Sequence, residues 1–336
     1  MGSGGTTLAE IAADAAVSVA TVSRVLNGKP GISDRKRVYI ERLLDERGYE
    51  RRKPRRPGAL IDLVMRGMDT QWAVGLLRGV HAEAARSKVD VVTTVTNGLP
   101  AGSSDWVERV MTRGTDGVVV VVSEIDETAR EELADLRVPI VLIDPVGTDT
   151  NAYVNVSATD WAGGRDATEH LVHLGHRRIG FVTGPMRLEC HVDRLDGYYA
   201  ALGRAGIASD PELVRHGDSL TAGGERFGGE LLDLDHPPTA IISGSDEQAY
   251  GIYLAAQKRG LRIPDDLSVT GFDDVDLCKW VTPQLTTVRQ PLEDMASEAT
   301  RLLLALARGD TISSRRVQLA SELIVRDSTG PAPDRT

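Results

Sequence analysis

The strongest chemical signal in this chain is a short run of basic residues. Five of the seven positions from 51 to 57 are basic and none is acidic: Arg51, Arg52, Lys53, Arg55 and Arg56. Positive charge at this density can neutralise the phosphates of a nucleic acid. A solvated linker is the alternative, because the two prolines of the run prevent a regular helix and like charges repel each other. The flanking segments must decide between these interpretations.

Charge is divided unevenly along the 336 residues, whose formal net charge is −10. Residues 1–58 hold twelve Lys and Arg against seven Asp and Glu, which gives +5. The remaining residues hold 27 basic and 42 acidic side chains, which gives −15. A basic end on an acidic body favours a DNA-reading head joined to a separate regulatory body.

Length and composition predict a globular protein of two or three folding units, with 41% hydrophobic and 26% charged residues. Cys190 and Cys278 lie far apart, which excludes a disulfide framework and a cysteine zinc site. His170, His173 and His176 are evenly spaced, but a glycine ends the helix before the third. We therefore expect no metal and no cofactor. The sequence has neither a membrane-length apolar run nor a secretion signal at its start, so we expect a cytoplasmic protein without a membrane partner.

Three short helices are expected in the first fifty residues. Thr7 has the hydroxyl of a helix N-cap, and a glutamate three residues later completes a capping box for a first helix. Ser18 then caps a second helix over residues 19–26, which Asn27 and the following glycine end. A third helix should run from about residue 33 to 47. Two helices joined by a tight turn and followed by a third are typical of a helix-turn-helix domain, whose second helix enters the major groove.

The outward positions of the second helix are the candidates for contact with bases. Arg24 can donate hydrogen bonds to a guanine edge or a phosphate. Val19 and Ala20 can make only apolar contacts, for example with a thymine methyl group, whereas Thr21 and Ser23 can hold phosphates. The alternative is an ordinary three-helix bundle in which these side chains face water.

The head also carries a family resemblance. The stretch TLAEIAADAAVSVATVSRVLNGKPGIS, followed by a helix that ends in ERGY, resembles the DNA-binding head of the lactose-repressor and galactose-repressor (LacI/GalR) family. The run VSVATVSRVLNG is specific to that family. The resemblance implies a homodimer on a pseudo-palindromic operator, with Val19 and Ala20 setting specificity beside Arg24. It also implies that several polar side chains hold the DNA backbone: Thr7, Ser18, Thr21, Ser23 and Asn27.

The rest of the chain alternates short apolar runs with amphipathic stretches. The runs predict buried strands at 60–64, 89–95, 117–122, 138–143, 178–183, 239–243 and 267–272. The stretches predict helices that include 71–87, 157–174, 188–205 and 246–259. Strands that are apolar on both faces and alternate with helices indicate parallel sheets in a doubly wound α/β arrangement. Seven such units suit two lobes better than one sheet.

The resemblance extends through this body. Its landmarks are TEHL, LGHRRIGF, GFDD and LTTVRQP, at 168–171, 174–181, 271–274 and 285–291. They resemble the effector-binding core shared with periplasmic sugar-binding proteins, which implies a bilobed, type I periplasmic-binding-protein-like α/β fold. The chain should then cross between lobes near 156–158, 287–290 and 319–322. The expected domains are a helix-turn-helix head (1–50), a basic, proline-containing hinge (51–59), a two-lobed effector-binding and dimerisation domain (60–327) and a disordered tail (328–336).

Candidate effector-binding residues lie near the ends of the predicted strands, where the crevice of a parallel sheet opens. Carboxylates and arginines can bind vicinal hydroxyls, and aromatic rings suit the C–H faces of a sugar. Arg194 precedes a Gly-Tyr pair where family members carry a sugar-binding arginine, and Asp273 opens the Phe-Asp-Asp turn. The full set is Asp69, Trp72, Asp144, Trp161, Arg194, Asp246, Asp273 and Trp280. For each carboxylate the alternative is a helix N-cap or a surface charge, and for each tryptophan it is the core.

Together these features predict a sequence-specific transcriptional regulator, a repressor, that responds to a sugar or oligosaccharide bound between its lobes. The segment TDWAGG at 159–164 also resembles xyloside-responsive actinobacterial members. A sugar-binding protein of a transport system is the alternative, since it shares the body, although the basic head disfavours it. A sugar-modifying enzyme would need a nucleophile or an acid–base pair within a motif, and the sequence offers none.

The hinge departs from the family pattern and generates a first prediction. Family members usually continue after the Gly-Tyr of the head with a short hinge helix, whose leucine wedges into the operator's minor groove. Here Tyr49 is followed by Glu50 and the basic run, and no leucine is available at the wedge position. We predict that arginines in a narrow minor groove replace the wedge, so that bound operator has no sharp central kink. Energy transfer between dyes at the two ends of an operator fragment measures the bend, and a kink like that of leucine-wedge members would contradict the prediction.

Overall fold

The structure is a computed structural model that describes residues 8–18, 21–22, 25, 32–47, 59–96, 104–121, 138–145 and 153–333. The chain divides into two compact units, residues 1–57 and 58–336. The division falls inside the segment that we expected to be the hinge. The two units are described separately below.

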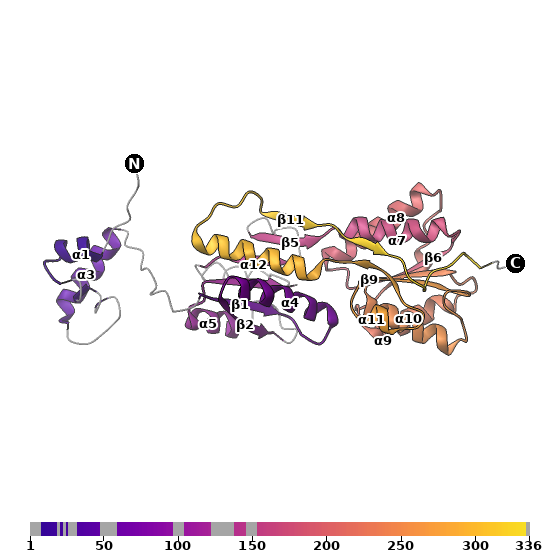
Figure 1. The fold of residues 1–336 in the computed structure, drawn as a ribbon, viewed down its shortest axis with the longest axis horizontal. Coiled ribbons are helices and arrows are strands. Elements are labelled where there is room, and N and C mark those ends of the chain that lie inside the picture. Colours follow the sequence, from indigo (N-terminus) through magenta and orange to yellow (C-terminus); the bar gives the residue numbers. More distant parts are fainter. Residues whose placement is uncertain are drawn as a thin grey trace. The chain divides into compact units, whose positions relative to one another are not determined.

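The first unit has a small apolar core of its own. Helices α1 (Leu8–Asp14) and α3 (Asp34–Glu46) are both drawn in indigo in Figure 1. The buried side chains include Ile11, Val22 and Ile40, which cluster together. The Ser18 hydroxyl accepts a hydrogen bond from the backbone N–H of Thr21 at 3.2 Å, as an N-cap does. The Ser18 cap predicted from the sequence is therefore confirmed.

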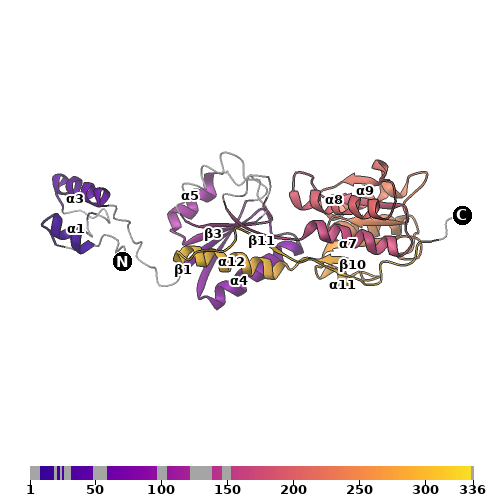
Figure 2. The same cartoon turned by 90° about the horizontal axis from the view of Figure 1, so that it is seen from above.

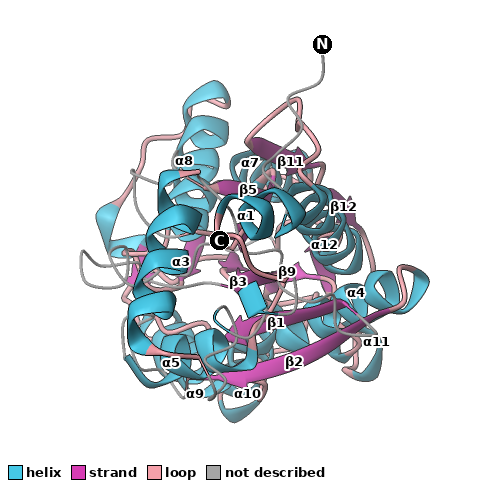
Figure 3. Ribbon diagram, turned by 90° about the vertical axis from the view of Figure 1, so that its left-hand side faces the viewer, coloured by secondary structure: helices cyan, strands magenta, loops and turns pink. Residues whose placement is uncertain are grey.

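The second unit consists of two lobes, each built on a six-stranded sheet. Lobe 1 has the strand order β11-β5-β4-β3-β1-β2, and its neighbouring strands are parallel. Its strands are β1 (Ala59–Met65), β2 (Val89–Val95), β3 (Gly117–Val121), β4 (Ile140–Ile143), β5 (Val154–Ala158) and β11 (Arg316–Leu319). Figure 3 shows β1 and β2 side by side at one edge of this sheet.

Lobe 2 has the strand order β12-β10-β9-β8-β6-β7, and only the outer pair β10–β12 is antiparallel among the described strands. Its strands are β6 (Ile179–Thr183), β7 (Val214–His216), β8 (Ala240–Ser243), β9 (Ser268–Asp273), β10 (Thr286–Arg289) and β12 (Glu322–Ile324). The doubly wound prediction is confirmed, and the seven predicted strands correspond to β1–β4, β6, β8 and β9.

Helices cover both faces of each sheet (Figure 2). In lobe 1, α4 (Gln71–Arg86) and α12 (Leu292–Arg308) pack on one face and α5 (Ser104–Arg113) on the other, where Trp106 is buried in the core. In lobe 2, α7 (Asp160–His173) and α8 (Glu189–Arg204) cover one face, and α9 (Thr221–Leu232) and α10 (Asp246–Lys258) the other. The short α11 (Leu277–Trp280) follows β9. In the described ranges, no helix is both long and apolar enough to cross a bilayer.

Three crossovers join the lobes, close to the predicted positions. They connect β5 to α7, β10 to α12 and β11 to β12. The predicted helix over 157–174 began too early, because residues 154–158 form the buried strand β5. Two of its five residues, Asn155 and Ser157, are polar, which hid the strand from a search for apolar runs.

Residues 328–333, which we expected to belong to a disordered tail, are ordered and pack on lobe 2. Ser328 is fully buried, and its hydroxyl donates to the Val269 carbonyl at 2.6 Å and accepts from the Thr286 N–H at 2.8 Å. The Ala332 N–H donates to the Leu174 carbonyl at 2.9 Å. The composition of this segment is that of a flexible tail, but these long-range hydrogen bonds hold it in place. The expectation was therefore wrong for residues 328–333.

Glycines allow α9 and α10 to approach closely. A Cβ atom on Gly224 would lie 1.9 Å from the Gln248 carbonyl oxygen, and one on Gly251 would lie 2.1 Å from the Thr221 carbonyl oxygen. In contrast, a Cβ on Gly203, in α8, would meet nothing within 4 Å. The backbones of α9 and α10 are thus in direct contact, which requires glycine.

This contact predicts opposite effects of two Gly→Ala substitutions. Gly224→Ala should lower the free energy of unfolding by about 1 to 3 kcal/mol, because the helices must separate. Gly203→Ala should leave that free energy unchanged or raise it by up to about 1 kcal/mol, because alanine favours the helix. Urea unfolding followed by circular dichroism measures both. Equal stability of the two variants would contradict the close contact.

Candidate functional site

A cavity of about 1130 Å³ lies between the two lobes. Its walls come from the carboxyl ends of strands in both lobes and from the first turns of the helices that follow. Lobe 1 contributes residues 65–70 at the end of β1. Lobe 2 contributes residues 218–220 after β7 and, after β6, Pro185, Arg187, Leu188, Cys190 and His191. Because parallel strands end at one edge of a sheet, the side chains that follow them converge on this cleft.

Five of the eight predicted effector-binding residues line the cavity: Asp69, Trp72, Asp144, Arg194 and Asp273. The first three come from lobe 1 and the other two from lobe 2. The cavity therefore combines acidic, basic and aromatic side chains from both lobes, as the sequence predicted.

Asp246 does not line the cavity, contrary to our expectation. It is fully buried at the start of α10, where its two oxygens accept hydrogen bonds from the Val275 N–H at 2.9 Å and the Thr287 hydroxyl at 2.5 Å. Burial raises the pKa of Asp246 to about 7, against the effect of these hydrogen bonds. The Asp246 carboxyl group thus links α10 to β10 and to the segment after β9 within lobe 2.

Trp161 and Trp280 also lie outside the cavity lining, which corrects a second expectation. Trp161 is 37% exposed in the first turn of α7, where the guanidinium of Arg165 lies 5.5 Å from the ring centroid. Trp280 ends the four-residue helix α11 and is 68% exposed. Trp161 follows the crossover from β5 to α7, and Trp280 follows β9, so both lie near the cleft in sequence. Neither side chain is part of the cavity lining.

Arg194 is a buried positive charge at the wall of the cavity. Its Nε donates to Asp160 Oδ1 at 2.7 Å, and its Nη1 donates to the Gly244 carbonyl at 2.6 Å. The guanidinium carbon lies 3.7 Å from the centroid of the Phe272 ring, in a cation–π contact. Although burial alone would lower the pKa of Arg194, Asp160 raises it above its ordinary value. Arg194 therefore remains charged.

Three carboxyl groups surround this single cation. Burial raises the pKa of Asp160, against the effect of Arg194. Burial and repulsion from Asp160 raise the pKa of Asp144 to about 8. Burial raises the pKa of Asp273 well above its ordinary value, although Gln290 donates to Asp273 Oδ1 at 2.6 Å. One guanidinium cannot balance three carboxylates, so part of this cluster is protonated near neutral pH and can donate hydrogen bonds.

The backbone is strained where it carries these side chains. Asp144 has a φ of 45°, Ser219 of 68° and Asp273 of 117°, and all three residues line the cavity. Positive φ values are uncommon outside glycine and occur mainly where surrounding structure imposes them. The fold therefore fixes the direction in which each of these side chains enters the cleft.

Several cavity residues were not predicted. They are Arg66, Arg187, His191, Asp218, Ser219 and Glu247, together with smaller and apolar neighbours. The Ser219 hydroxyl lies 3.0 Å from His191 Nε2, and burial, followed by the charge of Arg194, lowers the pKa of His191 well below its ordinary value. Arg66 follows β1 directly, so a search for polar residues at the ends of predicted strands could have found it. Asp218 and Ser219 follow β7, which has three residues and no apolar run.

The lobes touch each other at the edge of the cleft through Gln71. Its backbone N–H donates to Glu247 Oε1 at 3.1 Å, and its side-chain Oε1 accepts from the Leu277 N–H at 3.0 Å. Gln71 begins α4 in lobe 1, whereas both partners belong to lobe 2. A change in the angle between the lobes would alter these two hydrogen bonds.

Comparison with known proteins gives the family. Residues 7–52 match the family of bacterial regulatory proteins named lacI, and residues 168–329 match a periplasmic binding protein-like domain. The chain is 36% identical to the HTH-type transcriptional regulator MalR of Streptomyces coelicolor, over 98% of each chain. It is 32% identical to catabolite control protein A of Priestia megaterium, over 96% of this chain and 99% of that protein. The chain belongs to the LacI family.

A solved structure of a LacI-type regulator has the same fold over both parts of the chain. It is the transcriptional regulator CelR in complex with cellobiose, with 30% identity and a TM-score of 0.73 over 96% of this chain and 99% of that one. The protein is thus a DNA-binding transcriptional regulator with a two-lobed effector domain. The alternative, a sugar-binding protein of a transport system, is wrong, because the head matches a DNA-binding family and the relatives share it over their full length.

In this LacI-family head, two of the predicted DNA-contacting residues lie within the described part. The hydroxyls of Ser18 and Thr21 are 2.9 Å apart, at the start of the second helix. The other predicted contacts lie outside the described residues: Thr7, Val19, Ala20, Ser23, Arg24, Asn27, Arg51, Arg52, Lys53, Arg55 and Arg56.

The buried cluster of this regulator generates a stability prediction. Arg194→Ala should lower the free energy of unfolding by about 3 to 5 kcal/mol, because it leaves buried carboxylates without a countercharge. The loss should be larger at pH 8 than at pH 5. The carboxyl groups have folded-state pKa values above their unfolded ones, so ionisation destabilises the fold as the pH rises.

Urea unfolding at both pH values measures this effect. The double variant Arg194→Met with Asp160→Asn is the control, since it removes both charges and should regain most of the stability. A stable Arg194→Ala protein at pH 8 would contradict the assigned role of the pair.

Proposed function

We propose that a sugar or oligosaccharide binds in the cavity between the lobes and controls the affinity of the head for its operator. The observation that carries this proposal is the mixed lining of the cavity, with carboxylates such as Asp69 and Glu247, the indole of Trp72 and the arginines Arg66 and Arg187. Such a lining can exchange hydrogen bonds with hydroxyls and pack against C–H faces. Cellobiose in the related CelR structure supports this class of ligand.

The ligand acts by selecting one arrangement of the lobes. It contacts residues of both lobes, so it stabilises the angle at which those contacts are best formed. The Gln71 hydrogen bonds to lobe 2 are made or lost with that angle. Lobe 1 begins with β1, directly after the hinge, so its position determines where the hinge ends. The operator affinity can change only by the ratio of ligand affinities for the two arrangements.

The regulator acts as a homodimer on a pseudo-palindromic operator, with one head on each half-site. The body carries large apolar side chains that are exposed in the single chain and lie outside the cavity lining: Val74, Tyr250 and Trp280 among others. These side chains, from α4, α10 and α11, support a contact surface for a second copy. Trp280 then belongs to subunit contacts rather than to the cleft.

The ligand is bound and released unchanged, in the cytoplasm where the operator lies. A serine and a histidine do meet in the cavity, but His191 Nδ1 is buried without a hydrogen-bond partner in the described structure. A catalytic histidine is normally oriented by a third group at this atom. This geometry supports binding without chemistry.

Two substitutions should separate the two activities. Arg24→Ala should remove the preference for operator over random duplex and leave sugar binding unchanged. Asp69→Ala should retain operator binding and weaken sugar binding about tenfold or more, the cost of a lost hydrogen bond to a charged group. Arg194 is unsuitable for this purpose, because its removal disturbs the fold. Asp90→Ala, on an exposed strand residue outside the cavity, is the matched control for Asp69→Ala.

Fluorescence anisotropy with labelled promoter fragments measures DNA binding, and calorimetry with a panel of mono- and oligosaccharides measures ligand binding. A sugar that binds in the calorimetric test must also change the affinity of the protein for the operator, in either direction. If the protein prefers no promoter fragment over random duplex, with or without any saccharide, the proposed function is wrong.

A further inference from the structure

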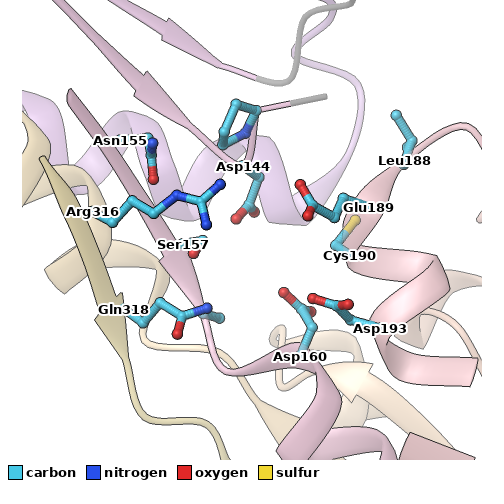
Figure 4. Close-up of a pocket in the computed structure, with 12 residues that line it drawn as sticks. Asp144, Asn155, Ser157, Asp160, Leu188, Glu189, Cys190, Asp193, Arg316 and Gln318 are labelled. Carbon is cyan, nitrogen blue, oxygen red and sulfur yellow. The ribbon is translucent and has the colours of Figure 1, made fainter. Parts of the chain in front are cut away.

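A second, smaller cavity of about 230 Å³ adjoins the main one (Figure 4). Asp144, Leu188 and Cys190 contribute to the walls of both cavities. The remaining walls of this side cavity are β5 and β11 of lobe 1 and the first turns of α7 and α8 of lobe 2. The cavity is therefore built from both lobes, like the main one, but from different strands.

The side cavity is rich in carboxyl groups. Asp144, Asp160, Glu189 and Asp193 surround its hollow, and Arg316 is the basic residue in its lining (Figure 4). Asp160 is already paired with Arg194. Three carboxyl groups thus face one guanidinium, which leaves an excess of negative charge when all are ionised.

Two buried polar atoms in this lining have no hydrogen-bond partner among the residues that the structure describes. They are Oδ1 of Asp144 and Nδ2 of Asn155, in residues that are 8% and 5% exposed. In Figure 4 the carboxyl group of Asp144 points into the hollow, and Asn155 lies at its edge. Buried polar groups in native proteins are nearly always paired, so two unpaired ones that line the same cavity point to a ligand.

The unpaired atoms and the charge together define the chemistry of that ligand. The amide Nδ2 needs an acceptor, such as a hydroxyl oxygen. Oδ1 of Asp144 needs a donor, and the excess negative charge of the carboxyl groups around the hollow favours a cation. We propose that the side cavity is a second ligand site, which binds a small hydroxylated compound that carries a protonated primary amine.

The titration of the carboxyl groups supports a cationic ligand. Burial and the charges of Asp160 and Glu189 raise the pKa of Asp193 to about 6. Burial and Asp160 raise the pKa of Asp144 to about 8, against the effect of Arg194. The Cys190 thiol and Arg316 complete the groups that face the hollow. An ammonium group favours the ionised carboxylates, so its binding should release protons and become tighter as the pH rises from 6 to 8.

The site would give the regulator a second input. Because its lining comes from both lobes, an occupant adds contacts across the cleft, as the ligand of the main cavity does. This inference does not depend on the nature of the ligand in the main cavity.

Isothermal titration calorimetry on the full-length protein tests the proposal with a matched pair of probes. Glucamine and sorbitol are open-chain polyols that differ in one ammonium group in place of one hydroxyl. Glucamine should bind at least tenfold more tightly than sorbitol at pH 8, and less tightly at pH 6 than at pH 8. Putrescine, which has the ammonium groups but no hydroxyls, should bind more weakly than glucamine, because it offers no acceptor to Asn155.

Two isosteric variants locate the binding. Glu189→Gln and Asp193→Asn should each reduce the affinity for glucamine several-fold, because each removes a carboxylate from the side cavity, and neither residue lines the main cavity. Asp193→Asn should also flatten the pH dependence of that affinity. The control is Asp235→Asn, an exposed carboxylate on the loop after α9, which should change nothing. Any sugar that binds the main cavity should bind these variants as it binds the unaltered protein, which separates this test from that of the proposed function.

Equal affinity for glucamine and sorbitol would overturn the proposal. So would glucamine binding that both variants retain in full, since the amine would then occupy another place. Stronger binding of putrescine than of glucamine would contradict the proposal that the ligand carries hydroxyl groups.

Discussion

The body of this regulator depends on one buried ion pair, between Arg194 of α8 and Asp160 of α7. Both charges are removed from water, and Asp160 lies where the chain has just crossed from lobe 1 to lobe 2. A buried charge is stable only with a full set of partners. Arg194 obtains them from Asp160, the Gly244 carbonyl and the face of Phe272, which belong to three separate segments of lobe 2. The pair thus fixes the wall of the cleft.

The ion pair also determines the character of the cleft. It leaves Asp144 and Asp273 as additional buried carboxyl groups near a cation that is already paired, and burial raises the pKa of both. Their backbones have positive φ values, which set the direction in which each Cα–Cβ bond points. The result is a cleft wall whose carboxyl groups enter from fixed backbone positions but can be either protonated or ionised. Such a wall can donate or accept hydrogen bonds, according to what the ligand offers.

Much of this architecture could be predicted from local sequence. Strands such as β3, with five consecutive buried residues, give a clear apolar run, and Ser18 lies at the start of a helix where its hydroxyl can cap it. Arg194 and Asp273 were found because a family motif or a strand end marks them. The same reasoning placed the lobe crossovers within a few residues.

The errors came from features that local sequence does not encode. Asp246 follows a strand, as a ligand-binding residue would. Its hydrogen bonds to Val275 and Thr287, however, direct its side chain into the interior of lobe 2. The order of the tail depends on Ser328 meeting Val269 and Thr286, which lie 59 and 42 residues away in the chain. His191 and Ser219 meet only in the folded protein. In each case the deciding partner is distant in sequence.

The interleaved path of the chain sets the order in which the protein can be completed during synthesis. Helix α12 covers one face of the lobe 1 sheet, and β11 supplies its last strand, yet both lie beyond residue 291. The head is synthesised within the first fifty residues, whereas the face of the lobe 1 sheet that α4 and α12 share stays partly uncovered until almost the whole chain has left the ribosome. A premature stop before residue 292 would therefore yield a head attached to a body in which neither lobe is complete.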